Sequence, residues 1–368
     1  MSGKFFLFLY WLGLSASAGA QEVDVSSMQW KNIVRMDNRE WYASEEARTV
    51  ADSVLKYQMP NGGWVKNQQW HIGADGKYLS ECKRTCVGTT IDNGATWQEM
   101  IFLAKIHNAA PRKIYRQAFR RALDYILEAQ YPNGGWRQFF PVRPTSDGSV
   151  HYSAHITFND CAMTNVLRLL RRISDNEPPF SSLRLDKKVR RRVLEAYTKG
   201  IDCILRCQIQ HEGQRTVWCQ QHDEKTLLPA KARAYELPSY TAHGETVDIL
   251  NLLMDIESPS DEIVDAVESA VKWLEEHAIH GYMVEKFTDA GGREDIRLVS
   301  SENAPALWAR FYDLENAEPM FCDRDGIPRK HIEDIGYERR NGYSWLGSSP
   351  AQIIQRYSEW KRTLPPEP

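Results

Sequence analysis

Two aspartates occupy corresponding places in this 368-residue sequence, each next to an asparagine where a helix is expected to begin. Asp92 lies in Thr-Ile-Asp-Asn-Gly-Ala-Thr, and Asp160 lies in Thr-Phe-Asn-Asp-Cys-Ala-Met-Thr. Capping the helix N-terminus is the ordinary role of such residues, although Asn93 and Asn159 can cap in place of the aspartates. The carboxylates would then be available for Ca²⁺, a hard cation that takes roughly six to eight oxygen ligands. At this level the residues support either capping or a calcium site.

Two arginines have the chemistry to bind an anionic substrate. Arg233 lies in the Ala-spaced stretch Ala-Lys-Ala-Arg-Ala-Tyr-Glu-Leu-Pro, and Arg310 lies in Leu-Trp-Ala-Arg-Phe-Tyr-Asp. Taken alone, Arg233 is best explained as a surface arginine. Arg310 is explained equally well as a helix-surface residue paired with Asp313, three residues on. The planar guanidinium fork nevertheless fits a carboxylate well.

A repeated turn must position these residues. The sequence Tyr57-Gln-Met-Pro-Asn-Gly-Gly-Trp64 recurs at residues 129–136, and a degraded copy runs from Gln208 to Trp218. Each copy follows a stretch with helical periodicity and precedes one of three helix starts, at residues 90, 157 and 239. A fourth, looser unit pairs residues 264–274 with a helix expected at residues 303–308. We expect Trp64 and Trp136 to lie in the core, where each locks one hairpin onto the next.

The repeated helix hairpins predict an all-α fold, a partial (α/α)3 toroid. We expect residues 21–368 to form it as a single domain. A toroid brings the N-termini of its inner helices to one mouth, where capping side chains and helix dipoles converge. Strand signals are few. Long loops expected at residues 66–89, 141–156 and 220–240 would cover the mouth.

The first twenty residues have the layout of a secretory signal peptide. Lys4 precedes an apolar run at residues 5–14, and small residues follow up to Ala20. We therefore expect a secreted or periplasmic protein with no membrane contact in its mature form. A net charge of -3, with 42% hydrophobic and 26% charged residues, argues against disorder and against nucleic acid as a partner.

The cysteine count is odd, so at least one of the seven thiols is expected to be free unless it pairs between chains. Cys82 and Cys86 lie in a loop-like stretch and could form a disulfide. Cys203 and Cys207 sit four apart in a helical pattern and are expected to be buried thiols. The sequence contains neither a CxxC pair nor an HExxH helix, so we expect no zinc site.

Six motifs occur in the order PNGGW, TIDNGAT, YPNGGWRQFFP, HITFND, ARAYELPS and LWARFYDLE. In that order they resemble the catalytic module of the family ten pectate lyases, from about residue 45 to the C-terminus. The resemblance implies calcium-dependent β-elimination on polygalacturonate, giving 4,5-unsaturated oligogalacturonides. We expect the protein to be a monomer. It also implies that Asp92 and Asp160 hold Ca²⁺, that Arg233 is the catalytic base and that Arg310 clamps a substrate carboxylate.

Asn93, Lys231 and Arg297 are further candidates for substrate binding, with Arg297 expected in a loop before Arg310. An arginine base must be neutral, whereas free arginine has a pKa above about 12.5. We therefore expect Ca²⁺ and neighbouring cations to lower the pKa of Arg233, and activity to favour alkaline pH. Glu236 is expected only to shape the loop.

Three other functions are considered. An inverting glycoside hydrolase would need two carboxylates about 6.5–9.5 Å apart, which Asp92 and Asp160 could supply. A non-catalytic helical protein would bind the polysaccharide without turnover. A triterpene cyclase, suggested by the Gln-x-x-x-Gly-Gly-Trp turns, would need a DxDD acid motif that the sequence lacks.

Overall fold

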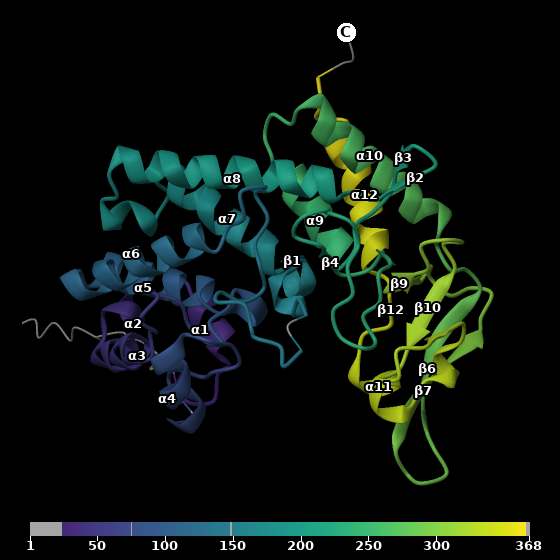
Figure 1. Ribbon diagram of the computed structural model, residues 1–368, viewed down its shortest axis with the longest axis horizontal. Coiled ribbons are helices and arrows are strands. Elements are labelled where there is room, and N and C mark those ends of the chain that lie inside the picture. The colour runs from purple at the N-terminus through teal and green to yellow at the C-terminus, as the bar shows by residue number, and fades with distance from the viewer. Residues whose placement is uncertain (1–23, 75, 148, 366–368) are drawn as a thin grey trace, which may run out of the picture.

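The computed structural model describes residues 24–74, 76–147 and 149–365, so the predicted leader at residues 1–20 lies outside the described part. The fold is helical, as predicted, with consecutive helices stacked side by side (Figure 1). The outer helices are α3 (Glu45–Lys56), α6 (Lys113–Glu128), α8 (Lys187–Cys207) and α10 (Asp261–Glu276). The inner helices are α5 (Trp97–Ala109), α7 (Ala162–Ser174), α9 (Glu245–Met254) and α12 (Ser349–Lys361). Helix α5 packs on α6, α7 on α8, and α9 on α10.

Each outer helix carries an apolar stripe, and two of them, α3 and α8, also have a side-chain cap at the N-terminus. In α8, Asp186 caps the helix by accepting a hydrogen bond from the Val189 backbone N–H at 2.9 Å. The predicted apolar faces are buried, which confirms the periodicity: the buried side chains of α6 include Tyr115, Ala118, Phe119, Ala122 and Ile126. The remaining short helices of the described chain are α1 (Trp30–Arg35), α2 (Arg39–Ala43), α4 (Gly76–Thr85) and α11 (Tyr337–Gly342).

A glutamine in each repeated turn ties one hairpin to the next outer helix. The side-chain amide of Gln58 donates to the Gly62 and Ala118 carbonyls, both at 2.9 Å, and Ala118 belongs to α6. Gln130 makes the same pair of bonds to Gly134 and to Ala196 of α8, at 2.9 and 2.8 Å. Gln208 repeats the arrangement with Thr216 and with Ala266 of α10, both at 2.9 Å. The degraded third copy of the turn therefore keeps the structural function of the first two.

The tryptophans of the turns lie in the core, as predicted. Trp64, Trp136 and Trp218 are fully buried, and each indole N–H donates to a carbonyl of the preceding outer helix. Gly134 shows why the turn needs glycine: its φ is +93°, and a Cβ there would lie 2.0 Å from the Lys199 carbonyl oxygen of α8. The turn thus seats its backbone directly on the next helix.

The C-terminal part departs from the predicted fourth hairpin. Residues 303–308 are not helical; they lead into short strands β8 (Trp308–Ala309) and β9 (Phe311–Tyr312). Helix α12 takes the expected inner position instead, packing against α9 and α10. A hairpin of β6 (Tyr282–Thr288) and β7 (Glu294–Ser300) intervenes, and it was not predicted. A small separate core of Phe311, Phe321 and Trp345, with neighbouring side chains, supports this part.

The described strands are short and form five small sheets. One has the order β11-β10-β9-β5, and the others pair β1 with β4, β2 with β3, β12 with β8, and β6 with β7. The strands not bounded above are β1 (Ile156–Thr157), β2 (Gln210–His211), β3 (Gln214–Arg215), β4 (Gln221–His222), β5 (Tyr240–Thr241), β10 (Pro319–Cys322), β11 (Pro328–Arg329) and β12 (Leu346–Gly347). The β1–β4 pair brings Thr157 beside Gln221, which matters for the site.

Two smaller expectations are not met by the structure. The loop expected at residues 66–89 contains helix α4, which also carries Cys82. The seven cysteines are free thiols, so the proposed bond between Cys82 and Cys86 is absent, whereas Cys203 and Cys207 are buried as predicted. None of the helices within the described ranges is long and apolar enough to cross a bilayer.

Candidate active site

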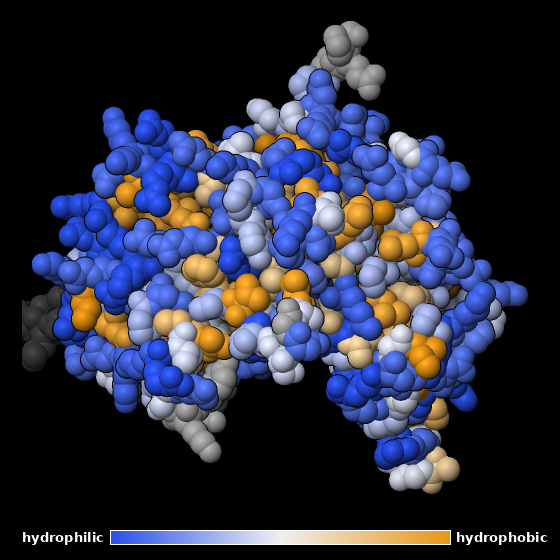
Figure 2. Space-filling view, viewed as in Figure 1, coloured by the Kyte–Doolittle hydropathy of each residue, from blue (hydrophilic) through white to orange (hydrophobic). Residues whose placement is uncertain are grey.

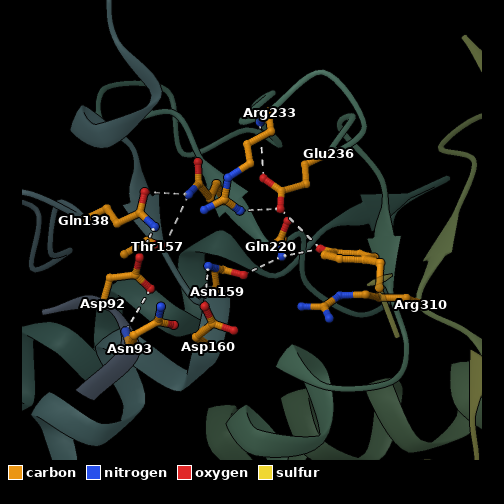
Figure 3. Close-up of polar contacts among 12 residues, drawn as sticks. Asp92, Asn93, Gln138, Thr157, Asn159, Asp160, Gln220, Arg233, Glu236 and Arg310 are labelled. Carbon is orange, nitrogen blue, oxygen red and sulfur yellow. Dashed lines mark hydrogen bonds and ion pairs between the residues drawn. The ribbon is translucent and has the colours of Figure 1, made fainter. Parts of the chain in front are cut away.

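The two aspartate motifs are short left-handed kinks that precede the inner helices. Asp92 begins a 3-10 turn in which Asn93 has φ +50°, and Asp160 itself has φ +52°. Helices α5 and α7 begin only after these kinks, and neither has a side-chain cap at its N-terminus. The expectation that Asn93 and Asn159 cap the helices is therefore wrong. Because the kink separates each motif from its helix, both the aspartate and the asparagine face the cleft (Figure 3).

Asp92 is fully buried, and polar groups from two repeats contact it. Its Oδ2 contacts the Lys66 ammonium and accepts a hydrogen bond from Gln138 Nε2 at 3.0 Å. Its Oδ1 accepts from the Asn93 backbone N–H at 3.0 Å. The Asn93 side chain donates to Asn67 Oδ1 at 2.9 Å. Asp92 is therefore a compensated buried charge rather than a capping group.

Asp160 lies near Asp92 but is exposed to solvent. Its Oδ2 accepts from Asn159 Nδ2 at 3.0 Å. Partial burial and repulsion from Asp92 and Glu245 raise the pKa of Asp160 to about 6, although Arg310 and Lys66 oppose the shift. Three carboxylates thus repel one another across this site, and a bound cation would relieve the repulsion.

Glu245 and Arg310 form an ion pair on the other side of Asp160. Glu245 begins helix α9 and is buried; Arg310 lies between β8 and β9, with its guanidinium 4.7 Å from the Tyr343 ring centroid. Burial alone would lower the pKa of Arg310, but Glu245, together with Tyr343 and Asp160, reverses that effect and raises it. The prediction that Arg310 lies in a helix and pairs with Asp313 is wrong, because the segment forms strands and Glu245 is the partner.

Arg233 is brought into the same cleft by the loop before β5. Its Nη1 donates to Glu236 Oε1 at 2.7 Å, and its backbone N–H donates to Glu236 Oε2 at 3.2 Å. The same Oε1 accepts from the Tyr343 hydroxyl at 3.2 Å. Burial by itself would lower the pKa of Arg233, but Glu236 more than reverses that effect and raises it. The expected neighbouring cations are not what Arg233 contacts; its partner is a buried anion.

Two predicted substrate-binding residues are not joined to this cluster. Arg297 lies in strand β7 rather than in a loop, pairs with Glu285 at 2.6 Å and is half exposed. Lys231 is exposed, and its Nζ lies near Gly326. Among the residues that the structure describes, no hydrogen bond or ion pair links either side chain to Asp92, Asp160 or Arg310.

Four members of the cluster were not predicted from the sequence: Lys66, Gln138, Gln220 and Glu245. The first three share a signal, because each follows the tryptophan of its repeated turn by two residues. Gln220 Nε2 donates to Asn159 Oδ1 at 2.6 Å and to Glu245 Oε1 at 3.2 Å. The repeat therefore delivers one polar side chain per hairpin to the site, and aligning the three turns would have found them.

The site has spare oxygen atoms that suit a hard cation. Within the described chain, Gln220 Oε1, Gln221 Oε1 and Glu245 Oε2 are buried and have no hydrogen-bond donor. Together with Asp92 and Asp160 they give carboxylate and amide oxygens of the kind that Ca²⁺ prefers. A second group that could hold a metal is His155, Asp223 and Glu224, whose ligand atoms lie within 4.8 Å of one another. The donor set at the aspartates fits Ca²⁺, and the two arginines beside it fit an anionic ligand.

The cleft lies between the helical and the β-rich parts of the molecule. Strands β1 and β4 stand between these parts in Figure 1, and the surface below them is indented in the space-filling view (Figure 2). In Figure 3, Arg233 approaches from one side, opposite Asp160, while Asp92 and Arg310 flank Asp160. A polymer lying in the cleft would therefore meet the carboxylates on one side and Arg233 on the other.

Comparison with known proteins adds to this geometry. The family model described as pectic acid lyase matches residues 58–354. The fold is similar to a solved structure of the family 10 polysaccharide lyase from Cellvibrio cellulosa, with 34% identity, a TM-score of 0.74, and coverage of 91% of this chain and 96% of that chain. A mutant of that lyase in complex with trigalacturonic acid is also similar, with 34% identity, a TM-score of 0.72, and coverage of 87% and 95%. No curated protein sequence matches the chain.

Proposed function

The chain belongs to the pectic acid lyase family and is a polysaccharide lyase, and from this premise we propose that it cleaves α-1,4-polygalacturonate by calcium-dependent β-elimination. The observation that carries the proposal is that Asp92, Asp160 and Arg310 lie together on one side of the cleft, opposite Arg233 (Figure 3), with Glu245 paired to Arg310 and close enough to Asp160 to raise its pKa. Trigalacturonic acid in the complex of the similar lyase supports a galacturonate substrate. The products would be 4,5-unsaturated oligogalacturonides.

In this reaction a base removes the proton on C5 of a uronate unit, and the bond from C4 to the glycosidic oxygen breaks. Negative charge develops on the substrate carboxylate as the proton leaves. Asp92 and Asp160 would hold Ca²⁺, with oxygens of Glu245, Gln220 and Gln221 available beside them. Bound Ca²⁺ would supply Lewis-acid stabilisation of the developing charge. Lys66 adds a fixed positive charge next to Asp92.

Arg310 would hold the carboxylate of the reacting uronate. One end of its guanidinium is engaged by Glu245, which fixes the side chain, while its Nε is buried without an acceptor among the described residues. A buried donor without an acceptor costs free energy. An anionic ligand that accepts a hydrogen bond from Nε would remove this cost. We assign Arg310 this orienting role and Asn93, beside Asp92, a contact with substrate hydroxyls.

Arg233 would accept the C5 proton. It must be neutral to do so, and the ion pair with Glu236 opposes loss of its proton. The pH of maximal activity is therefore set by how strongly Glu236 holds Arg233 in its charged form. We propose that activity is confined to alkaline pH for this reason.

The direct test is incubation with polygalacturonate, with and without a chelator, followed by ultraviolet absorbance of the new double bond. Elimination gives absorbance that rises with time and is abolished by chelation. An inverting hydrolase would instead release reducing ends without absorbance, and a non-catalytic binding protein would give neither signal. Reducing ends without absorbance would refute the proposal.

We also propose that the protein is exported to the periplasm or the medium and acts as a monomer. The signal-like layout of residues 1–20 supports export. N-terminal sequencing should find a start near Gly19 or Gln21, and light scattering should give the mass of one chain. An intact Met1 in active material would contradict export by this signal.

A further inference from the structure

A basic cavity lies along α5 and is lined also by residues of α1 and α2. Its volume is about 510 Å³. The acidic residue of its lining is Asp37, whereas five cationic side chains line it: Lys31, Arg35, Arg39, Lys105 and Arg172. The cavity therefore has an excess of positive charge, which favours an anionic ligand.

The cations of this cavity divide into structural and available ones. Lys105 donates to the Val34 and Met36 carbonyls, at 2.8 and 2.7 Å, and so holds α1 in place. Arg172 is paired with Glu177 at 3.2 Å. Lys31, Arg35 and Arg39 are exposed and have no ion pair within the described chain. These three side chains from α1 and α2 are the ones that can bind a ligand.

Two aromatic side chains are also part of the cavity lining. Trp97 and Tyr42 both line the cavity. The indole Nε1 of Trp97 is buried and has no acceptor in the part of the chain that the structure describes. Aromatic rings with a polar tip pack against the apolar face of a sugar ring while hydrogen-bonding its oxygens. The cavity thus combines positive charge for carboxylates with one indole, that of Trp97, that could contact a pyranose ring.

A second, smaller cavity connects this region to the catalytic cluster. Its volume is about 140 Å³, and it shares Lys31 and Gln98 with the larger cavity. Lys66 and Asn93, which contact or adjoin Asp92, also line it. The lining residues of the two cavities therefore extend from Asn93, beside Asp92, through the shared Lys31 and Gln98 to the basic cavity.

Glu99 gives this connecting cavity an unsatisfied polar group. Its Oε1 accepts from both Trp30 Nε1 and Trp70 Nε1 at 2.7 Å, while its Oε2 is buried without a partner among the described residues. Glu99 is 2% exposed and lines the cavity. A hydroxyl group of a ligand in this cavity would satisfy this oxygen, as a carbohydrate provides.

We infer that the two cavities form a distal binding track for uronate units of a long polygalacturonate chain, beyond the unit that is cleaved. This inference rests on the proposed function. Residues 30–43, which supply α1 and α2, precede the family-matched range of residues 58–354. The three available cations of the track therefore lie outside the range that the family model matches.

The test compares two double charge reversals that change the net charge equally. Arg35→Glu with Arg39→Glu alters the track, while Lys188→Glu with Arg192→Glu alters the exposed face of α8. With long polygalacturonate, the track variant should raise KM about tenfold with kcat unchanged, equivalent to about 1.4 kcal/mol of binding. With trigalacturonic acid, which is too short to occupy both the cleft and the whole track, kcat/KM should stay within about twofold.

Two results would overturn the inference: an equal rise in KM for both double variants, or an equal loss on trigalacturonic acid and on the long polymer. Circular dichroism establishes that both variants are folded. Binding without turnover is measured by titrating long polygalacturonate into Arg233→Ala and into variants that combine Arg233→Ala with either double charge reversal. If the wild type cleaves no pectate, the proposed function fails, and this titration still decides the inference. The inference is supported if Arg233→Ala binds the polymer and the added track changes abolish that binding. It is refuted if the track changes leave binding unchanged, or if Arg233→Ala does not bind the polymer at all.

Discussion

Arg233 donates from Nη1 to the buried carboxylate of Glu236 at 2.7 Å, so the proposed base is held in its charged form before any substrate binds. The pair couples two opposite requirements. Glu236 orients the guanidinium toward the cleft, where Asp160 lies opposite (Figure 3), yet it makes deprotonation harder. The first two predictions separate these effects.

Replacing Arg233 should remove proton abstraction while leaving the fold intact. We expect Arg233→Ala to lower kcat at least about 10³-fold, within the range that positioned proton transfer contributes. Arg233→Lys should recover part of the activity with a lower pH optimum, because an amine loses its proton more readily than a guanidinium. Steady-state kinetics on polygalacturonate measures both. A kcat that is unchanged in Arg233→Ala, with only KM raised, would show that Arg233 binds substrate and that another group is the base.

Replacing Glu236 with glutamine should move the alkaline requirement without removing activity. The amide oxygen can still accept from Arg233 and Tyr343, but the negative charge that raises the pKa of Arg233 is gone. The midpoint of the rise of kcat with pH should therefore move to lower pH. The pH–rate profile of Glu236→Gln beside the wild type measures the shift. A midpoint that moves upward or stays fixed would show that Glu236 does not control the protonation of Arg233.

Calcium binding should depend on the protonation of Asp160. The pKa of this carboxyl is raised to about 6 by burial and by repulsion from Asp92 and Glu245. Because a proton competes with the metal, calcium affinity should fall about tenfold per pH unit below that value. Isothermal titration calorimetry with Ca²⁺ between acidic and neutral pH measures the effect directly.

The matched variants for this experiment are Asp160→Asn and Asp202→Asn. Asp160→Asn should bind Ca²⁺ weakly and lose the pH dependence, whereas Asp202→Asn, on the exposed face of α8, should behave like the wild type. Full activity of the wild type in excess chelator would exclude a role for the metal.

Glu99 should make the stability of the protein depend on pH. Burial raises the pKa of this carboxyl from its usual 4.5 to about 7, although hydrogen bonds from Trp70 and Trp30 oppose the shift. As pH rises, the unfolded chain ionises first, so the folded state loses stability between about pH 4.5 and 7. The loss should reach roughly 3 kcal/mol. Glu99→Gln does not titrate, so urea unfolding at pH 4 and pH 8 should show a smaller drop for this variant; equal drops would contradict the prediction.

The repeated turn should tolerate a side chain only where no helix lies against it. Gly134 and Gly213 both have positive φ, at +93° and +79°, but a Cβ at Gly213 would meet nothing within 4 Å. Gly213→Ala should cost about 1–2 kcal/mol of unfolding free energy from its backbone conformation. Gly134→Ala should cost about 1–3 kcal/mol more, because its Cβ would overlap the Lys199 carbonyl. Denaturant unfolding measures both, and equal costs would show that the turn is not seated on α8.

The helix hairpins and their turns were predictable from the sequence, whereas the C-terminal strands and the position of α12 were not. The apolar stripes and the Gly-Gly-Trp turns are local signals, so three hairpins and the approach of Asp92 to Asp160 followed from them. Arg310 was misplaced because the apolar run around Trp308 resembles a helix, and only pairing with β12 and β5, distant in sequence, makes it strand. Helix α12 was not predicted as the fourth inner helix for a similar reason: the β6–β7 hairpin separates it in sequence from α9 and α10, on which it packs.

The charge state of Arg233 was also beyond local reasoning. Glu236 lies three residues from Arg233 in the sequence and was expected only to shape the loop. Its effect on Arg233 depends on its burial, and Tyr343, more than one hundred residues away, contributes to that environment. Periodicity indicates which residues face the cleft, but not how strongly their neighbours hold a proton.

The glutamine of each repeated turn also constrains the order in which the protein can be completed during synthesis. Gln58, Gln130 and Gln208 donate to carbonyls that lie 60, 66 and 58 residues further along the chain. As the polypeptide leaves the ribosome, each new hairpin thus carries an amide whose partner has not yet been made. Each is satisfied only when the next outer helix emerges, and α10 is the last helix to serve in this way. The three amides can therefore be satisfied in order from the N-terminal hairpin, and at each stage the unpaired amide lies at the most recently synthesised hairpin.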